Sequence, residues 1–361
     1  MPEIAEIVRT FGPTYRERYG ERMLPSHVRA LRDLSACRTE TLGGHLAQCD
    51  QCGHQHYAYH SCRNRSCPQC HTGDRERWLD KRRAELLPIP YFHVVFTLPT
   101  ELQALIWRHQ KRMYAVLFKA AASALLSLTA DPRYVGGEVG ILGVLHTWSR
   151  QLNRHPHVHC LVTGGGLTAA GEWVGARKRY LVPVAALSKI FRAKFLALAR
   201  KALPEEPFPD SLWEKDWVVY CKPALQGNKK LLDYLGRYVH RIAITNRRIL
   251  SIRNNRVTFE YKDSRDHRWK QCTLPGEEFL RRFLSHVLPR GFHKVRYYGL
   301  LAPGRRKSLR HLQWSLAEPA SHPAERLQGQ DETTGSHPCP VCEIGLMLFV
   351  ARIPRSPRGP P

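Results

Sequence analysis

The stretch HPHVHCLVTGGGL, residues 155–167, places histidines at alternating positions before an apolar run that ends in three glycines. Side chains two residues apart in a β-strand lie on the same face of the sheet. A strand here would therefore present His157 and His159 together and direct Val158 and Cys160 to the opposite face. Two imidazoles in this arrangement favour a divalent metal site. Histidines that are satisfied within a protein core would produce the same pattern.

The sequence leaves the third ligand of such a metal open. His155 continues the alternation, but Pro156 follows it and favours a bend. His146 and His93 are further candidates, and each is equally compatible with a place in the core.

The histidine strand lies among segments with clear strand and helix patterns. Runs rich in β-branched and aromatic residues predict strands over 91–99 and 217–225. Apolar residues three and four positions apart predict short helices in 1–35 and longer ones elsewhere. The longer predicted helices are 72–88, 101–128, 228–244 and 277–289. Residues 256–263 and 267–274 have the pattern of a hairpin.

Six of the eleven cysteines fall before residue 71. CDQC at 49–52 and CPQC at 67–70 are separated by fourteen residues, 53–66. This spacing is typical of a structural zinc site, in which each CxxC directs two thiolates at the ion. It predicts a tetrahedron of Cys49, Cys52, Cys67 and Cys70. Cys37 and Cys62 are extra, although Cys62 could replace one ligand.

A second, isolated half-site follows near the end of the chain. CPVC at 339–342 has the spacing of a zinc knuckle, but the rest of the segment after residue 303 is rich in Arg, Pro and Ser. Such composition predicts a mostly extended or disordered tail. The role of Cys339 and Cys342 stays open at this point.

The charge of the chain favours a polyanionic partner. Its 361 residues contain 56 Lys and Arg against 31 Asp and Glu, a formal net charge of +25. Nucleic acid is the partner that such a balance favours most. We expect a cytoplasmic, nucleoid-associated protein, because the sequence has neither a signal peptide nor a run long enough to span a membrane.

Two tyrosines complete a recognisable combination of motifs. Tyr234 and Tyr238 lie four residues apart in DYLGRYVHR, so a helix would place both phenols on one face. The pair Tyr15 and Tyr19 has the same spacing, so spacing alone does not choose between them. A strand with the HxH pattern, a further strand and then a tyrosine helix is the order found in the HUH single-strand endonucleases.

The resemblance then becomes close over residues 35–303. The segments that carry it are CRTETLGGHLAQCDQCG (37–53), YHSCRNRSCPQC (59–70), LHTWSRQLNRHPHVHCLVTGGGL (145–167), WVVYCKP (217–223), YLGRYVHRIAITNRRI (234–249) and FLRRFLSHVLPRGFHKVRYYGLLA (279–302). Together they resemble the rolling-circle transposases of the insertion-sequence-91 family. The resemblance implies an α+β fold, in which a zinc-ribbon DNA-binding domain precedes an antiparallel-sheet catalytic domain.

The resemblance also implies a division of the chain and a chemistry. We expect a helical segment over 1–36, a zinc ribbon over 37–85, a catalytic domain over 86–303 and a tail over 304–361. Tyr234 or Tyr238 would attack a phosphate of single-stranded or hairpin DNA to give a 5′-phosphotyrosine. Mg²⁺ or Mn²⁺ at His157 and His159 would assist, while Zn²⁺ would be structural.

Contacts to DNA are expected from basic side chains. The residues predicted for this role are Arg63, Arg65, Arg237, Arg247 and Arg248. Gly164, Gly165 and Gly166 would either form a turn or permit a close approach of the DNA backbone. Two alternatives remain: a replication initiator or relaxase with the same chemistry, and a non-catalytic zinc-ribbon DNA-binding protein.

Overall fold

The computed structural model describes residues 2–70, 85–177, 179–224, 236, 242–263, 265–316 and 337–356. Its centre is an antiparallel sheet in the order β11-β4-β5-β3-β7, with a short strand β6 paired to β5. These strands are β3 (Tyr91–Thr97), β4 (Glu138–Trp148), β5 (Arg154–Leu167), β6 (Trp173–Gly175), β7 (Val219–Pro223) and β11 (Val295–Gly299). The α+β fold with an antiparallel sheet is confirmed, and the quoted histidines lie on its middle strand.

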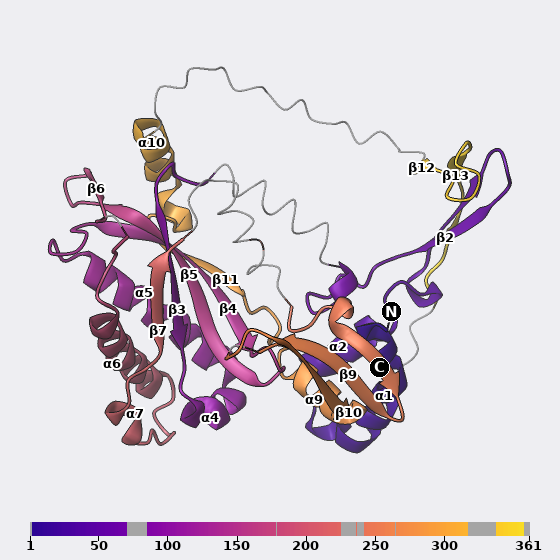
Figure 1. The fold of residues 1–361 in the computed structure, drawn as a ribbon, viewed down its shortest axis with the longest axis horizontal. Helices are drawn as coiled ribbons and strands as arrows, with labels where there is room; N and C mark the ends of the chain where they lie inside the picture. Colours follow the sequence, from indigo (N-terminus) through magenta and orange to yellow (C-terminus); the bar gives the residue numbers. More distant parts are fainter. Residues whose placement is uncertain are drawn as a thin grey trace.

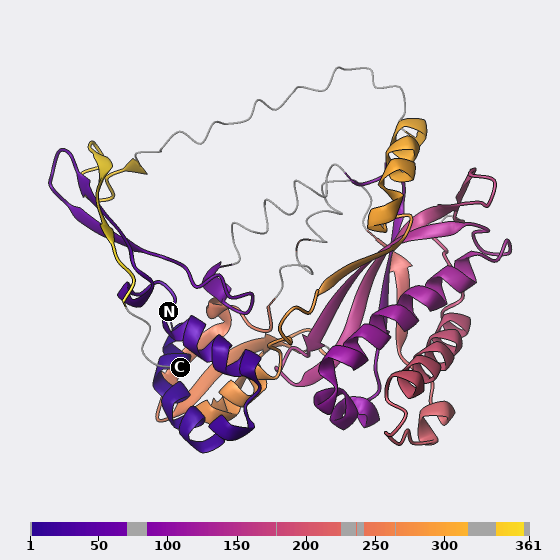
Figure 2. The ribbon, with the colours of Figure 1, turned by 180° about the vertical axis from the view of Figure 1, so that it is seen from behind.

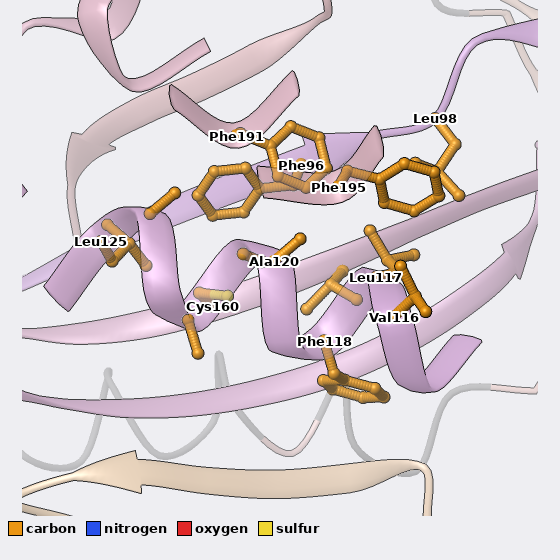
Figure 3. Packing of buried hydrophobic residues seen from close by; sticks show 14 of the residues in the cluster. Phe96, Leu98, Val116, Leu117, Phe118, Ala120, Leu125, Cys160, Phe191 and Phe195 are labelled. Carbon is orange, nitrogen blue, oxygen red and sulfur yellow. The ribbon is translucent and has the colours of Figure 1, made fainter. Parts of the chain in front are cut away.

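Two long helices cover one face of this sheet (Figure 1), α5 (Gln110–Thr129) and α6 (Val184–Ala202). Figure 3 shows Phe191 and Phe195 of α6 packed over Phe96 of β3, with Cys160 of β5 in the same cluster. Val158 and Cys160 are 0% and 2% exposed. The predicted alternation is thus confirmed, since these side chains enter the core and leave the histidines on the other face.

The three glycines of the quoted stretch lie inside β5 and form no turn. A Cβ at Gly164 would lie 2.6 Å from the carbonyl oxygen of Pro90, and one at Gly165 would lie 2.4 Å from the Trp173 ring. Both distances are shorter than a non-bonded contact allows, so no larger residue fits. The expectation of a turn was wrong, and these glycines are needed because the protein's own backbone and Trp173 occupy the space beside this strand.

A second core brings together the N-terminal helices and the segment that begins at residue 243. Helices α1 (Ile4–Tyr19) and α2 (Pro25–Ser35) pack with α9 (Gly276–Leu284) against the sheet β10-β9-β8. The strands of that sheet are β8 (Ile249–Arg253), β9 (Arg256–Lys262) and β10 (Trp269–Pro275). The expected catalytic segment 86–303 therefore divides between two cores, and the second one includes the N-terminal helices (Figure 2).

The segment after residue 303 is more ordered than its composition predicted. Helix α10 (Arg306–Leu316) packs Leu309 and Leu312 against Leu87 and Leu300. Strands β12 (His337–Pro338) and β13 (Leu346–Ile353) join β1 (Gly44–Cys49) and β2 (Gln55–Tyr59) in a sheet of order β12-β13-β1-β2. The prediction of a disordered tail was wrong for these stretches, because α10 buries leucines, and β12 and β13 are paired into the sheet of β1. Figure 1 shows this sheet apart from the central one.

Several of the remaining predicted helices and strands are present in the structure. The predicted hairpin is β9 and β10, and the predicted helix 101–128 forms α4 (Gln103–Arg108) and α5. A one-turn helix, α7 (Ser211–Glu214), precedes β7. Most of the predicted helices 72–88 and 228–244 lies outside the described residues. Among the helices that are described, none has the length and apolar character needed to cross a membrane.

His286 connects the second core to the loop between β4 and β5. Its Nε2 donates to the carbonyl of Leu152 at 3.0 Å, and its Nδ1 lies 3.2 Å from the Thr147 hydroxyl. Because a carbonyl only accepts, Nε2 carries the proton, and in the neutral ring Nδ1 accepts from Thr147. Burial lowers the pKa of His286 to about 4, so the ring is neutral at pH 7.

This histidine predicts a loss of stability in acid. The unfolded chain binds a proton on His286 below pH 6.5, whereas the folded protein takes it up only near pH 4. The contribution of His286 to the free energy of unfolding is therefore fully present above pH 6.5. It falls by about 3 kcal/mol as the pH drops to 4. Urea unfolding at several pH values measures this free energy. We expect His286→Gln to flatten the pH dependence and the exposed-residue control His311→Gln to leave it unchanged; equal slopes in all three proteins would contradict the prediction.

Candidate functional site

Three histidines meet on the face of the central sheet opposite α5 and α6. His157 and His159 project from β5, and the register of the neighbouring strand places His146 of β4 directly across from His157. The ring centroid of His146 is 5.5 Å from that of His157 and 4.5 Å from that of His159. One nitrogen from each ring lies within 4.8 Å of the other two. The geometry thus selects His146, from the three candidates left open, as the third member of the group.

Hydrogen bonds orient the paired rings. His157 Nδ1 lies 2.6 Å from the carbonyl oxygen of His155, so Nδ1 carries the proton and the lone pair of the neutral ring is on Nε2. His159 Nδ1 lies 2.9 Å from Nε2 of His93, whose ring stacks on it at 5.1 Å. Burial lowers the pKa of His93 to about 4, which keeps that ring neutral. Such second bonds are what fix the tautomer of a metal-binding histidine.

The surroundings of the three histidines carry positive charge and aromatic rings. Among the strands of the central sheet the only carboxylate is Glu138, which pairs with Arg305 at the end of β4. Lys222 pairs with His93 across β3 and β7 and therefore shares its face. Trp148 stacks on His146 with centroids 4.7 Å apart. A cation held here would face no protein anion on these strands, so it would attract the phosphates of a nucleic acid.

Tyr220 is a tyrosine near this group that the sequence did not single out. It lies on β7, its ring is 5.8 Å from that of His93, and 42% of its surface is exposed. The predicted nucleophiles Tyr234 and Tyr238, and Arg237 between them, lie outside the described residues. Of the pair with the same spacing, Tyr15 is buried in the second core, and burial raises its pKa.

The cysteines form two groups of four, each different from the predicted set. Cys37, Cys62, Cys67 and Cys70 make one group, and Cys49, Cys52, Cys339 and Cys342 make the other. The predicted tetrahedron of Cys49 and Cys52 with Cys67 and Cys70 was wrong, because β1 and β2 carry the first knuckle toward β13 and away from the second. Among the described residues every cysteine is a free thiol.

The sulfur positions fit a tetrahedral ion in both groups. Sγ–Sγ distances are 3.5 Å for Cys37–Cys67, 3.6 Å for Cys62–Cys70 and 3.6 Å for Cys49–Cys342. A zinc ion with Zn–S bonds of about 2.3 Å requires ligand sulfurs about 3.8 Å apart, whereas a disulfide brings them to about 2.0 Å. The spacing is therefore that of a metal site. Zinc binds the thiolate form of such cysteines.

The predicted DNA-binding arginines divide into exposed and anchored residues. Arg63 and Arg247 are exposed. Arg65 donates to the carbonyls of Phe292, Leu288 and Pro289 at 2.6–2.8 Å and so ties the first cysteine group to the central domain, although part of its side chain stays exposed. Arg248 donates to the carbonyls of Glu260 and Arg150 at 2.7 Å. These bonds give Arg65 and Arg248 a structural role that the sequence did not indicate.

Fold and site together define the class: a basic, metal-binding protein suited to act on nucleic acid. Residues 140–309 match the family model described as "Putative transposase", and residues 7–98 match the "Transposase zinc-binding domain". The chain belongs to the insertion-sequence-91 family of transposases, as its sequence resemblance implied.

Two curated relatives support this membership. The chain is 39% identical to "Putative transposase y4qJ" of Sinorhizobium fredii, over 97% of this chain and 95% of that protein. It is 30% identical to the "Transposase for insertion sequence element IS801" of Pseudomonas savastanoi pv. phaseolicola, over 76% of this chain and 70% of that protein. No solved structure matches the chain significantly.

Sequence reasoning did not assign four of the cysteine ligands of these sites, although a signal for them existed. Eight of the cysteines lie close enough in sequence to another to suggest two sets of four, and CPVC is itself a complete half-site. Counting ligands would have favoured two ions, with Cys37, Cys62, Cys339 and Cys342 included. His146 was one of three candidates for the third ligand, and only the register between β4 and β5 selects it, because it brings His146 to the other histidines.

Proposed function

We propose that this transposase cleaves and rejoins single-stranded DNA at the ends of its element through a tyrosine–DNA intermediate. The observation that carries the proposal is the group of His146, His157 and His159 on the central sheet of a transposase, whose strands carry one carboxylate, Glu138, paired with Arg305. Imidazoles held close together by a rigid sheet suit a metal-assisted phosphoryl transfer.

Tyr234 or Tyr238 is the proposed nucleophile. Its phenolate would attack the phosphorus in line, forming a bond from the tyrosine oxygen to the 5′-phosphate while the 3′-oxygen leaves and takes up a proton. The phosphodiester energy is conserved in the covalent link, so a later attack by a 3′-hydroxyl rejoins the strand without nucleotide hydrolysis. With two tyrosines, one could hold the donor strand while the other cleaves a second strand.

The residues that fit a catalytic metal are the three histidines. Their nitrogens lie within 4.8 Å of one another, and the hydrogen bond of His157 Nδ1 leaves Nε2 as the donor atom. A divalent ion bound there would neutralise negative charge on the scissile phosphate. Nitrogen ligands favour Mn²⁺ over Mg²⁺, which prefers oxygen. Zn²⁺ is proposed as structural, in the cysteine group of Cys37.

DNA is the proposed partner of the basic surface around these sites. Arg63 lies on the loop between Cys62 and Cys67, and Arg247 lies just before β8; both are exposed. Each phosphate that they neutralise on a single strand would add about 0.7 to the salt dependence of binding. We propose that this activity takes place in the bacterial cytoplasm, on the DNA of the nucleoid.

A covalent trap tests the proposal. The purified protein is incubated with single-stranded hairpin oligonucleotides from the element's ends and with Mg²⁺ or Mn²⁺, then denatured and separated. We expect a protein–DNA adduct that survives denaturation, with the attached peptide identified by mass spectrometry as one containing Tyr234 or Tyr238. Cleavage without any adduct would exclude tyrosine chemistry, and an adduct on another residue would reassign the nucleophile.

The alternatives differ in ways that the same assay resolves. A replication initiator or relaxase would form the adduct on an origin sequence rather than on the element's ends. A non-catalytic DNA-binding protein would bind the hairpin and form none. Both curated relatives are named as transposases, which favours the ends of an insertion sequence as the substrate.

A further inference from the structure

We propose that Cys49, Cys52, Cys339 and Cys342 bind a second zinc ion, and that this ion fastens the C-terminal strand β13 to the N-terminal zinc-binding domain. The matched family models cover residues 7–98 and 140–309. Residues 337–356, which supply half of the ligands, lie outside both. The zinc-binding family model thus includes Cys49 and Cys52 but neither Cys339 nor Cys342, so it does not describe the complete site.

The first argument is that the two half-sites are built alike. Backbone N–H groups point at the first sulfur of each: Gln51 N lies 3.4 Å from Cys49 Sγ, and Val341 N lies 3.4 Å from Cys339 Sγ. The residue after each second cysteine, Gly53 or Glu343, has a positive φ, +71° and +60°. A knuckle that turns through a left-handed residue and donates amides to its sulfur is arranged to stabilise thiolates.

The amide of each of these residues closes the same turn. Gly53 N donates to the carbonyl of Cys49 at 3.2 Å, and Glu343 N donates to that of Cys339 at 3.0 Å. A positive φ is costly for a residue such as glutamate, yet Glu343 adopts the conformation that glycine takes in the other half-site. The two half-sites thus have the same backbone conformation, so each presents its two sulfurs in the same way to one shared ion.

The second argument is the distance between the half-sites. Cys49 Sγ lies 3.6 Å from Cys342 Sγ, and Cys52 Sγ lies 3.7 Å from Cys339 Sγ. Both agree with the separation of about 3.8 Å expected around tetrahedral zinc. The amide of Gly345 also points at Cys342 Sγ at 3.4 Å, so the second sulfur of this half-site receives a backbone N–H group as well. Asp50 Oδ1 also accepts from Leu346 N at 2.9 Å and links the two half-sites directly.

The third argument is that apolar burial is too small to hold β13 in place. Leu348, Phe349 and Val350 are 49%, 64% and 50% exposed, although β13 pairs with β1 along six residues from Gly44 to Cys49. A short sheet without a covered face is marginally stable in water. Metal binding supplies the folding free energy of modules that lack a core, so the ion accounts for an ordered strand here.

Metal counting on the full-length protein tests the site. The protein is purified under reducing conditions, and zinc and iron per chain are measured by elemental analysis and native mass spectrometry. We expect two zinc ions in the wild type, one in Cys339→Ser/Cys342→Ser, and two in the control Cys272→Ser, whose cysteine lies on β10 outside both groups. One zinc in the wild type, two in the double variant, or iron in place of zinc would overturn the proposal.

A second measurement needs no cysteine substitution. A specific protease site is inserted between residues 325 and 326, and the cleaved protein is passed through gel filtration. The fragment 326–361 should elute with the rest of the protein while zinc is bound and separate after a chelator removes it. Separation of the fragment with zinc still present at two ions per chain would overturn the proposal. Neither measurement depends on DNA cleavage, so their outcome is independent of the proposed function.

Discussion

Replacing both Tyr234 and Tyr238 with phenylalanine is expected to abolish the covalent protein–DNA adduct. Phenylalanine lacks the oxygen that would bond to phosphorus, and water cannot take its place in a covalent link. Removal of a nucleophile lowers the rate of such enzymes by about 10⁴-fold or more. The measurement is the fraction of labelled hairpin DNA that stays attached to protein after denaturation, at Mn²⁺ and Mg²⁺ concentrations that saturate the wild type.

Tyr220→Phe provides a matched control for this double change. Tyr220 is exposed and lies beside His93 on the histidine face. The variant Tyr220→Phe therefore removes a phenolic hydroxyl close to the proposed metal. We expect it to keep adduct formation within about tenfold of the wild type, the size expected of one lost hydrogen bond. Loss of the adduct in Tyr220→Phe, together with its survival in the double variant, would place the nucleophile on β7.

The single variants distinguish two roles for the tyrosines. If one tyrosine cleaves and the other transfers, then one of the variants Tyr234→Phe and Tyr238→Phe keeps the first cleavage and the other loses it. Neither variant completes strand transfer. Equal cleavage and transfer by both single variants would show that the tyrosines are interchangeable.

The histidine strand was predictable because the information is local. Alternation with a period of two decides which side chains share a face, and the buried Val158 and Cys160 show that β5 follows it. His146 was not predictable to the same extent. Its place depends on the register between β4 and β5. Two irregularities change that register, one between Val139 and Ile141 and the other between His146 and Trp148.

The composition of the two cysteine groups depends on long-range contacts and was not predictable from local sequence. CxxC half-sites are visible in the sequence because the two ligands of a knuckle are adjacent, but nothing local decides which knuckles share an ion. Cys49 and Cys342 are 293 positions apart and lie 3.6 Å from each other. Their meeting depends on the pairing of β1 with β13. The residues of β13 are mainly apolar but mostly exposed, so no alternation of apolar and polar residues predicts that pairing.

The N-terminal helices were predicted from the sequence, but their packing partners in the second core were not. The amphipathic pattern of residues 4–35 indicates a face to bury, and that face packs against α9 and β9. Gly276 shows how close this contact is, since a Cβ there would lie 2.4 Å from the ring of Phe11. Long-range packing of this kind depends on complementary shape, which a hydrophobic period does not encode.

His159→Ala is expected to lower strand cleavage by about 10³-fold, because loss of a ligand removes most of the several kcal/mol with which a metal stabilises the transition state. His159 is the centre of the group: its ring lies 4.8 Å from that of His157, 4.5 Å from that of His146 and 5.1 Å from that of His93. The adduct assay measures the rate, and electron paramagnetic resonance measures Mn²⁺ binding to the same protein.

The control for this change is His155→Ala on the same strand. His155 contributes its backbone carbonyl to His157, and alanine keeps that carbonyl, so Mn²⁺ binding and cleavage should stay within about tenfold of the wild type. His146→Ala then separates a three-histidine site from a pair. If His146 is a ligand, its loss should weaken Mn²⁺ binding as His159→Ala does. Unchanged binding in His146→Ala with loss in His159→Ala would restrict the site to the two histidines of β5, and normal cleavage by His159→Ala would remove the metal from the mechanism.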